Sequence, residues 1–145
     1  MLNSTHQFLD SLKSHDFNPT DKLVSFDVVS LFTNVPLNET INVIAQYVYS
    51  ENSRCTPPFS KAVFVKLLQI ATGGTFCHND KLYKQVDGVA MGNPLGPTLA
   101  NFFLAHIETT LFDNISSKPD LYLRYVDDIF AVFRSLQQFN HSSSI

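Results

Sequence analysis

The chain has 145 residues, of which 44% are hydrophobic and 12% aromatic, so it can bury the core of one ordinary domain and is not expected to be disordered. Its formal net charge of −3 argues against a free-standing nucleic-acid binder, which needs clustered Lys and Arg. Without a membrane-length apolar run or a signal peptide, the sequence indicates a soluble, intracellular protein with no membrane contact, in either nucleus or cytoplasm. Cys55 and Cys77 are expected to be reduced thiols with no disulfide partner.

The first half of the chain predicts one strand among helices. Branched and aromatic residues favour a strand in KLVSFDV, with Asp27 near its end. Apolar residues at helical spacing predict a helix capped by Asn38, and Ser60 is expected to cap the next one. The predicted elements are a helix at 5–15, a strand at 22–28, a helix from Asn38 to Tyr49, and a helix from Ser60 to Gly73-Gly74.

The second half predicts two hairpins on either side of a loop and a helix. The first hairpin turns at Asn79-Asp80, and the second carries Asp127-Asp128 at its tip. The resulting order, β-α-α-ββ-α-ββ, is typical of an α+β fold with an antiparallel sheet packed on helices. The predicted elements are strands at 75–78 and 81–86, a loop at 88–97, a helix at 98–112, and strands at 121–126 and 129–133.

Three carboxylates are the candidate catalytic groups. Asp127 and Asp128 stand between two apolar strands, where adjacent charges are unfavourable unless a cation neutralises them. If Asp27 lies on a neighbouring strand, the three acids form a hard-oxygen site for Mg²⁺, with Mn²⁺ as a substitute. Two such ions would support nucleotidyl transfer. The alternative is that Asp127-Asp128 is only a turn, since Asp is a common turn residue.

The loop at 88–97 is the second candidate feature. Its glycines allow a nucleotide or a nucleic-acid strand to approach the backbone closely. It lacks the Gly-Lys-Ser/Thr ending of a phosphate-binding P-loop. A Gly/Pro loop before a helix also serves as a plain connection, so both readings stay open.

Taken in order, three segments resemble the palm blocks of reverse transcriptases. The three segments are FDVVSLFTNVP, the loop MGNPLGP and YVDD. Their sequences most resemble those of Penelope-like retroelement polymerases, which are relatives of the telomerase catalytic subunit. The stretches that carry this closer resemblance are SFDVVSLFTNVPL, VDGVAMGNPLGPTLAN and RYVDD. The resemblance implies a partial polymerase palm with a catalytic Asp-Asp hairpin. It divides the chain into an N-terminal lead-in at 1–19, a partial palm and fingers domain at 20–134, and a truncated polar tail at 135–145.

The resemblance also implies a role for each matching residue. Asp27 and Asp127 would be the principal metal ligands, Asp128 the supporting acid, and the carbonyl of Val28 a further ligand. Phe32 falls on the steric-gate position that favours deoxynucleotides, although it could instead be a core aromatic. Met91 and Gly92 would contact the nucleotide, and Pro94 and Tyr125 the nucleic acid.

Two positions depart from the family pattern, and Arg124 has two readings. Gln is common in the family where Met91 stands, and Ser is usual where Gly96 stands, which puts the local contact at Gly96 in doubt. Arg124 could face a phosphate, but a solvated strand charge is the favoured reading.

The predicted function is an RNA-directed DNA polymerase fragment. The full enzyme would use an RNA template, a DNA primer and dNTPs. No fingers region precedes residue 20 and no thumb follows, so we expect little or no polymerase activity from this chain by itself. The alternative is a non-catalytic remnant or interaction module that keeps the palm scaffold.

Overall fold

The computed structural model describes residues 2, 4–51, 53 and 56–134, and the chain divides into two compact units. Unit 1 comprises residues 1–29 and 109–145, and unit 2 comprises residues 30–108. Cys77 is a free, exposed thiol, whereas Cys55 and the predicted tail at 135–145 lie outside the described residues. Within the described ranges, no helix has the length and apolar character needed to cross a membrane.

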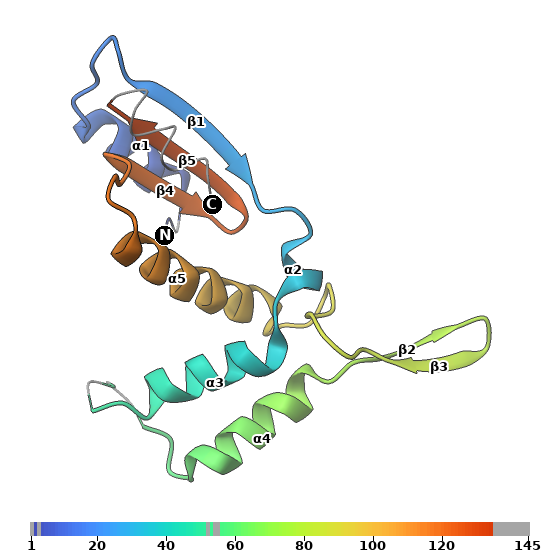
Figure 1. The fold of residues 1–145 in the computed structure, drawn as a ribbon. Coiled ribbons are helices and arrows are strands. Elements are labelled where there is room, and N and C mark those ends of the chain that lie inside the picture. The colour runs from blue at the N-terminus through green and yellow to red at the C-terminus, as the bar shows by residue number, and fades with distance from the viewer. Residues whose placement is uncertain (1, 3, 52, 54–55, 135–145) are drawn as a thin grey trace. The chain divides into compact units, whose positions relative to one another are not determined.

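Unit 1 is a three-stranded antiparallel sheet with helices on its faces (Figure 1). The strand order is β1-β5-β4, so the strand nearest the N-terminus pairs with the last one. The unit contains α1 (Thr5–Ser14), β1 (Lys22–Asp27), the end of α5 (Gly96–Asn114), β4 (Leu121–Tyr125) and β5 (Asp128–Phe133).

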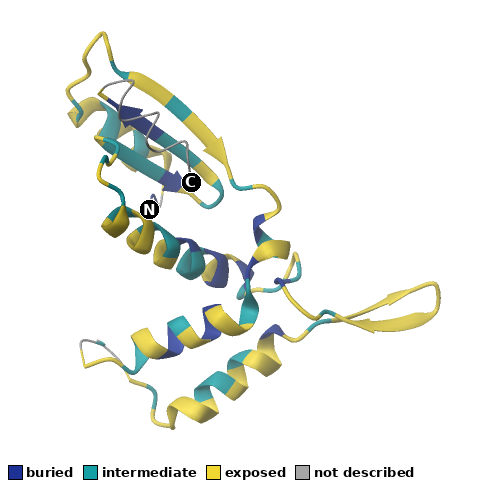
Figure 2. Cartoon of the chain, in the orientation of Figure 1, coloured by how far each residue is buried: buried dark blue, intermediate teal, exposed yellow. Residues whose placement is uncertain are grey.

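The two faces of this sheet are covered by different helices. Phe8 of α1 meets Phe130 edge to face at 5.7 Å, while Phe112 of α5 meets Tyr122 at 4.9 Å. The register pairs Tyr122 with Ala131, next to Phe130, so the two ring contacts lie on opposite faces. β5 is central and ends in the buried run Ala131–Phe133, whereas β1 is an exposed edge strand (Figure 2).

Unit 2 is mainly helical. It contains α2 (Leu31–Asn34), α3 (Leu37–Val48), α4 (Lys61–Thr72), the start of α5, and a separate hairpin of β2 (Thr75–His78) and β3 (Lys81–Lys84). On α3, Ile41, Ile44 and Ala45 are buried, on the face that their helical spacing predicts. On α5, the buried residues are Gly96, Leu99, Ala100 and Leu104. The stripe expected there from Leu99 to Leu111 is wrong, because Leu111 is exposed. The most deeply buried apolar residues of the unit are Val35, Ile41, Ala45, Val89, Leu99 and Ala100.

The predicted α+β class, the antiparallel sheet and the order of the long elements are confirmed. The Ser60 cap is also correct, since its hydroxyl accepts from the N–H of Val63 at 3.4 Å. Asn79 and Asp80 both have positive φ, as a tight two-residue hairpin turn requires. α5 begins at Gly96, two residues earlier than expected, and the four-residue α2 was not predicted.

Two local predictions are wrong. Asn38 does not cap its helix, because α3 begins one residue before it and the N–H of Leu37 donates to the distant carboxylate of Asp87 at 2.9 Å. The second hairpin turns at Val126 and Asp127, not at the two acids, so Asp128 is the first residue of β5.

Candidate active site

Asp27 and Asp128 face each other across the β1–β5 ladder. They are register partners, and both are exposed. The N–H of Val28 donates to the carbonyl of Asp127 at 3.1 Å, which makes Val28–Asp127 the hydrogen-bonded type of pair. Hydrogen-bonded and non-hydrogen-bonded pairs alternate along an antiparallel ladder, so the neighbouring pair, Asp27–Asp128, is non-hydrogen-bonded. In such a pair the Cα atoms are about 4.5 Å apart and the side chains are closer than in a hydrogen-bonded pair. Like charges placed directly opposite each other are destabilising.

The third acid, Asp127, lies in the turn that joins β4 to β5. It is half-buried, and the residue before it, Val126, has φ = 55°. A β-branched residue in this region is an outlier, and such strain persists only where the surroundings enforce it. The strained turn therefore fixes the backbone of Asp127 beside the pair formed by Asp27 and Asp128.

Arg124 supports this turn from within unit 1. It is only 1% exposed, and its Nη1 donates to the carbonyl of Val126 at 3.0 Å. Arg124 is therefore buried, and its interpretation as a solvated strand charge is wrong. A buried guanidinium requires polar partners, and the carbonyl of Val126 is one of them.

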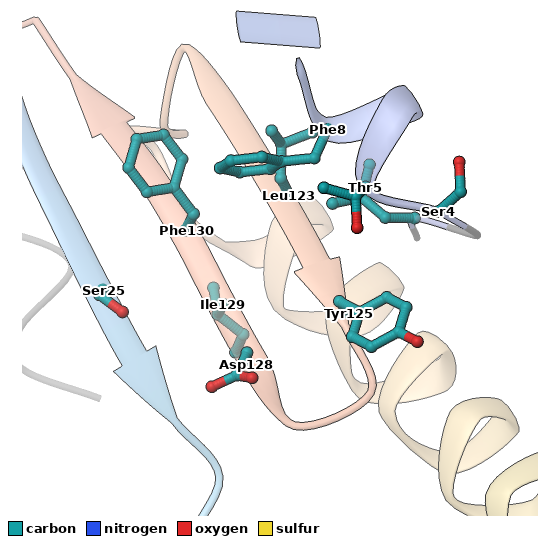
Figure 3. Close-up of a pocket in the computed structure, with 10 residues that line it drawn as sticks. Ser4, Thr5, Phe8, Ser25, Leu123, Tyr125, Asp128, Ile129 and Phe130 are labelled. Atoms are coloured by element: carbon teal, nitrogen blue, oxygen red, sulfur yellow. The ribbon is translucent and has the colours of Figure 1, made fainter. Parts of the chain in front are cut away.

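A hollow of about 320 Å³ lies between α1 and the sheet face that carries Asp128 (Figure 3). Tyr125, the register partner of Asp128 on β4, lines it and is exposed. Figure 3 shows Phe8 of α1 beside Phe130, at a distance along the strands from Asp128. The hollow thus joins an apolar floor to the acidic end of the sheet.

In unit 2, the stretch after β1 is bonded to the loop at 88–97. The carbonyl of Phe32 accepts from the N–H of Val89 at 2.7 Å. Gly88 has φ = 75°, and a Cβ on it would lie 2.6 Å from the carbonyl oxygen of Thr33. Only glycine permits this approach, so Gly88 joins the loop at 88–97 to the segment after β1 that contains Thr33.

The predicted nucleotide and nucleic-acid contacts of unit 2 differ in exposure. Phe32 is half-buried, with its ring close to Gly96. Met91, Gly92 and Pro94 are exposed, and Gly92 has φ = 95° with open space where a Cβ would be.

Asp87 is a residue of this region that the sequence reasoning missed. Its carboxylate accepts from the N–H of Leu37 and from that of Gly88, both at 2.9 Å. These bonds hold the pKa of Asp87 below its ordinary value of 3.8. The only signal in the sequence was the Asp-Gly dipeptide before the loop.

The structure groups the predicted residues by unit. Asp27, Val28, Tyr125, Asp127 and Asp128 belong to unit 1, while Phe32, Met91, Gly92 and Pro94 belong to unit 2. In the part of the chain that is described, no three His, Cys, Asp or Glu side chains are arranged to hold a metal ion. The donor chemistry of the three acids fits Mg²⁺, but joint ligation requires their side chains to rotate.

Comparisons with known proteins show the family and the fold. A family model described as "Reverse transcriptase (RNA-dependent DNA polymerase)" matches residues 2–145. The search of curated proteins gave no match.

Three solved telomerase structures share the fold. The apo telomerase of Candida tropicalis truncated from its C-terminal domain has a TM-score of 0.67 and 18% identity, and covers 98% of this chain and 31% of its own. The Candida albicans telomerase, solved with a TWJ fragment of telomeric RNA, has a TM-score of 0.73 and 13% identity, and the match covers 99% of this chain and 28% of that telomerase. Apo telomerase from Candida tropicalis has a TM-score of 0.73 and 16% identity, and the match covers 98% of this chain and 28% of that telomerase. The chain thus spans less than a third of each telomerase.

Proposed function

This chain belongs to the reverse transcriptase (RNA-dependent DNA polymerase) family. We propose that Asp27, Asp127 and Asp128, which we call the carboxylate edge, are the catalytic acids of an RNA-directed DNA polymerase. The observation that carries the proposal is the placement of Asp27 opposite Asp128, with Asp127 in the adjoining strained turn. A sheet that sets two exposed carboxylates face to face is stabilised by a cation at that point.

In this proposal, each acid has a distinct task. Asp27 and Asp127 are the principal ligands, Asp128 is the supporting acid, and the carbonyl of Val28 completes one shell. Two Mg²⁺ ions, or Mn²⁺, would supply activation of a primer 3′-hydroxyl and stabilisation of the leaving pyrophosphate. The β1–β5 register and the bond from Val28 to Asp127 support this assignment, because they hold the backbones of these residues next to one another.

The loop segments of unit 2 would recognise the substrate. Phe32 is proposed as the steric gate against a ribose 2′-hydroxyl, with Met91 and Gly92 at the nucleotide and Pro94 at the nucleic acid. In unit 1, Tyr125 is proposed as a further contact with the nucleic acid. The exposure of the last four residues supports these contacts. The packing of Phe32 near Gly96 suits both a gate held in place and a core aromatic.

The proposed subfamily and domain division follow from the sequence resemblance described above. We place residues 20–134 in a palm with adjoining fingers elements, preceded by a lead-in at 1–19, in a Penelope-like retroelement polymerase. Its partners would be an RNA template, a DNA primer and dNTPs. The chain spans less than a third of each telomerase.

The second candidate is a non-catalytic remnant that keeps the palm scaffold. It is favoured by one observation, that the described residues contain no three-ligand group already arranged for a metal.

Divalent-metal titration tests the carboxylate edge directly. Thermal unfolding is followed for the wild type, Asp27→Asn, Asp128→Asn and the control Asp113→Asn, an exposed acid at the end of α5. In EDTA, Asp27→Asn and Asp128→Asn should each raise the free energy of unfolding by about 0.2–1 kcal/mol, because the like-charge pair is removed. In millimolar Mg²⁺ or Mn²⁺, the wild type and the control should gain stability and the edge variants should not.

A wild type that does not respond to either metal would favour the remnant and remove the proposed role. Primer extension on an RNA template with dNTPs completes the test. Extension that Asp127→Asn abolishes would support a catalytic role of these carboxylates.

A further inference from the structure

The β2–β3 hairpin carries a surface that the carboxylate edge does not use. All eight of its strand residues are exposed, and it extends away from α3 and α4 within unit 2 (Figures 1 and 2). A two-stranded hairpin is marginally stable by itself in water. A partner that covers one face would therefore stabilise it.

One face of the hairpin is aromatic and basic. Phe76 and Tyr83 are register partners, and their rings stack at 5.5 Å with planes 15° apart. His78 and Lys81 form the next pair on the same face, and the His78 ring lies 6.4 Å from that of Tyr83. None of these four residues is acidic.

The opposite face differs in chemistry. It carries Thr75, Cys77, Leu82 and Lys84, with Leu82 82% exposed. No ring lies on this face, so it offers hydrophobic contact but no stacking surface.

A further group of cations lies where the hairpin joins the rest of unit 2. A groove there of about 470 Å³ is lined by Lys66 and by Lys84, a residue of the opposite face, together with the amides of Asn38, Gln69 and Gln85. None of its lining residues carries a carboxylate. The groove therefore favours a polyanion near the hairpin, whereas the cation on the aromatic face itself is Lys81.

We propose that the aromatic face of the β2–β3 hairpin binds single-stranded nucleic acid. Bases stack on Phe76 and Tyr83, and the Lys81 ammonium pairs with the phosphate backbone. Aromatic platforms beside cations are the general means of holding single strands without sequence preference. The inference rests on the proposed function in one respect, that a polymerase must hold a template or a primer.

The test uses the absence of tryptophan from the chain, which makes Phe76→Trp a single fluorescent reporter on the aromatic face. Oligouridine and oligothymidine are added in EDTA, so that the carboxylate edge takes no part. We expect the fluorescence of Phe76→Trp to be quenched by stacked bases. Leu82→Trp, on the opposite face, should change little.

Affinity measurements complete the test. By fluorescence anisotropy of a labelled oligonucleotide, Tyr83→Leu should weaken binding about 5- to 150-fold, the range that corresponds to one lost base stack. Lys81→Ala should lower the slope of log K against log salt by about 0.7. Circular dichroism confirms that each variant remains folded.

Three results would overturn the proposal. The first is equal quenching of the two Trp reporters, and the second is unchanged affinity of Tyr83→Leu. Self-association that the oligonucleotide cannot displace would assign the face to a second copy, which also overturns it. Retained binding without any Mg²⁺ response would count against the proposed function alone.

Discussion

The guanidinium of Arg124 donates a 3.0 Å hydrogen bond to the carbonyl of Val126, the first residue of the turn that carries Asp127. A buried cation thus holds the backbone that positions a candidate catalytic acid. The turn is maintained from inside the unit and not by its own residue preferences, since Val disfavours a positive φ.

Loss of the Arg124 side chain should destabilise unit 1. Arg124→Met is expected to lower the free energy of unfolding by about 1.5–3 kcal/mol for the charged hydrogen bond that it removes. The matched control is Arg134→Met, which breaks an exposed ion pair with Asp120 and should cost at most about 1 kcal/mol. Urea unfolding followed by circular dichroism measures both, and equal losses would show that the bond to Val126 contributes nothing.

Relief of the strain at Val126 should raise the free energy of unfolding, whereas loss of the Arg124 side chain should lower it. Val126→Gly removes a backbone cost of about 1–3 kcal/mol and adds a glycine entropy cost of about 0.5–1 kcal/mol, so a net gain near 1 kcal/mol is expected. Val29 is exposed and has no positive φ, so Val29→Gly should only lose stability. Differential scanning calorimetry of the two variants decides the matter, and a lower melting temperature for Val126→Gly would refute the strain.

Gly88 and Gly92 should respond differently to the same change. Both have positive φ, which costs an L residue about 1–2 kcal/mol, but only Gly88 lacks space for a Cβ. Gly88→Ala should therefore lose more stability than Gly92→Ala, since it must also push Thr33 away. Denaturant midpoints measure the difference, and similar values would mean that the contact with Thr33 is loose.

Acid should selectively weaken the start of α3. The pKa of Asp87 is lowered in the folded state, so its contribution is present above the ordinary value of 3.8 and is lost as the pH falls through the lowered value. The stability advantage of the wild type over Asp87→Asn should thus shrink below about pH 4. Unfolding curves between pH 6 and pH 2 test this, roughly the window in which carboxyl groups titrate. A constant difference would contradict it.

Patterns that are local in the sequence predicted most of the fold. Helical spacing, the Ser60 cap and the Asn79-Asp80 turn each depend on neighbouring residues, and each is confirmed. The placement of Asp27 on a strand beside the Asp-Asp hairpin also followed, once the strands were assumed to be neighbours.

The failures have a common physical cause, which is control by distant or buried groups. The cap of α3 comes from Asp87, fifty positions along the chain, so no signal near Asn38 could reveal it. The second turn is placed at Val126 by a buried arginine, against the turn preferences that favoured the two acids. The burial of Arg124 could not be read from its charge.

The pairing of β1 with β5 has a consequence for biosynthesis. On the ribosome, β1 emerges about a hundred residues before its partner, and during that interval Leu23 and Phe26 border an open strand edge. Unpaired apolar edges recruit other chains, so the nascent protein is exposed to aggregation until Asp128 and its strand have been made. Premature termination anywhere between these strands would leave that edge permanently open.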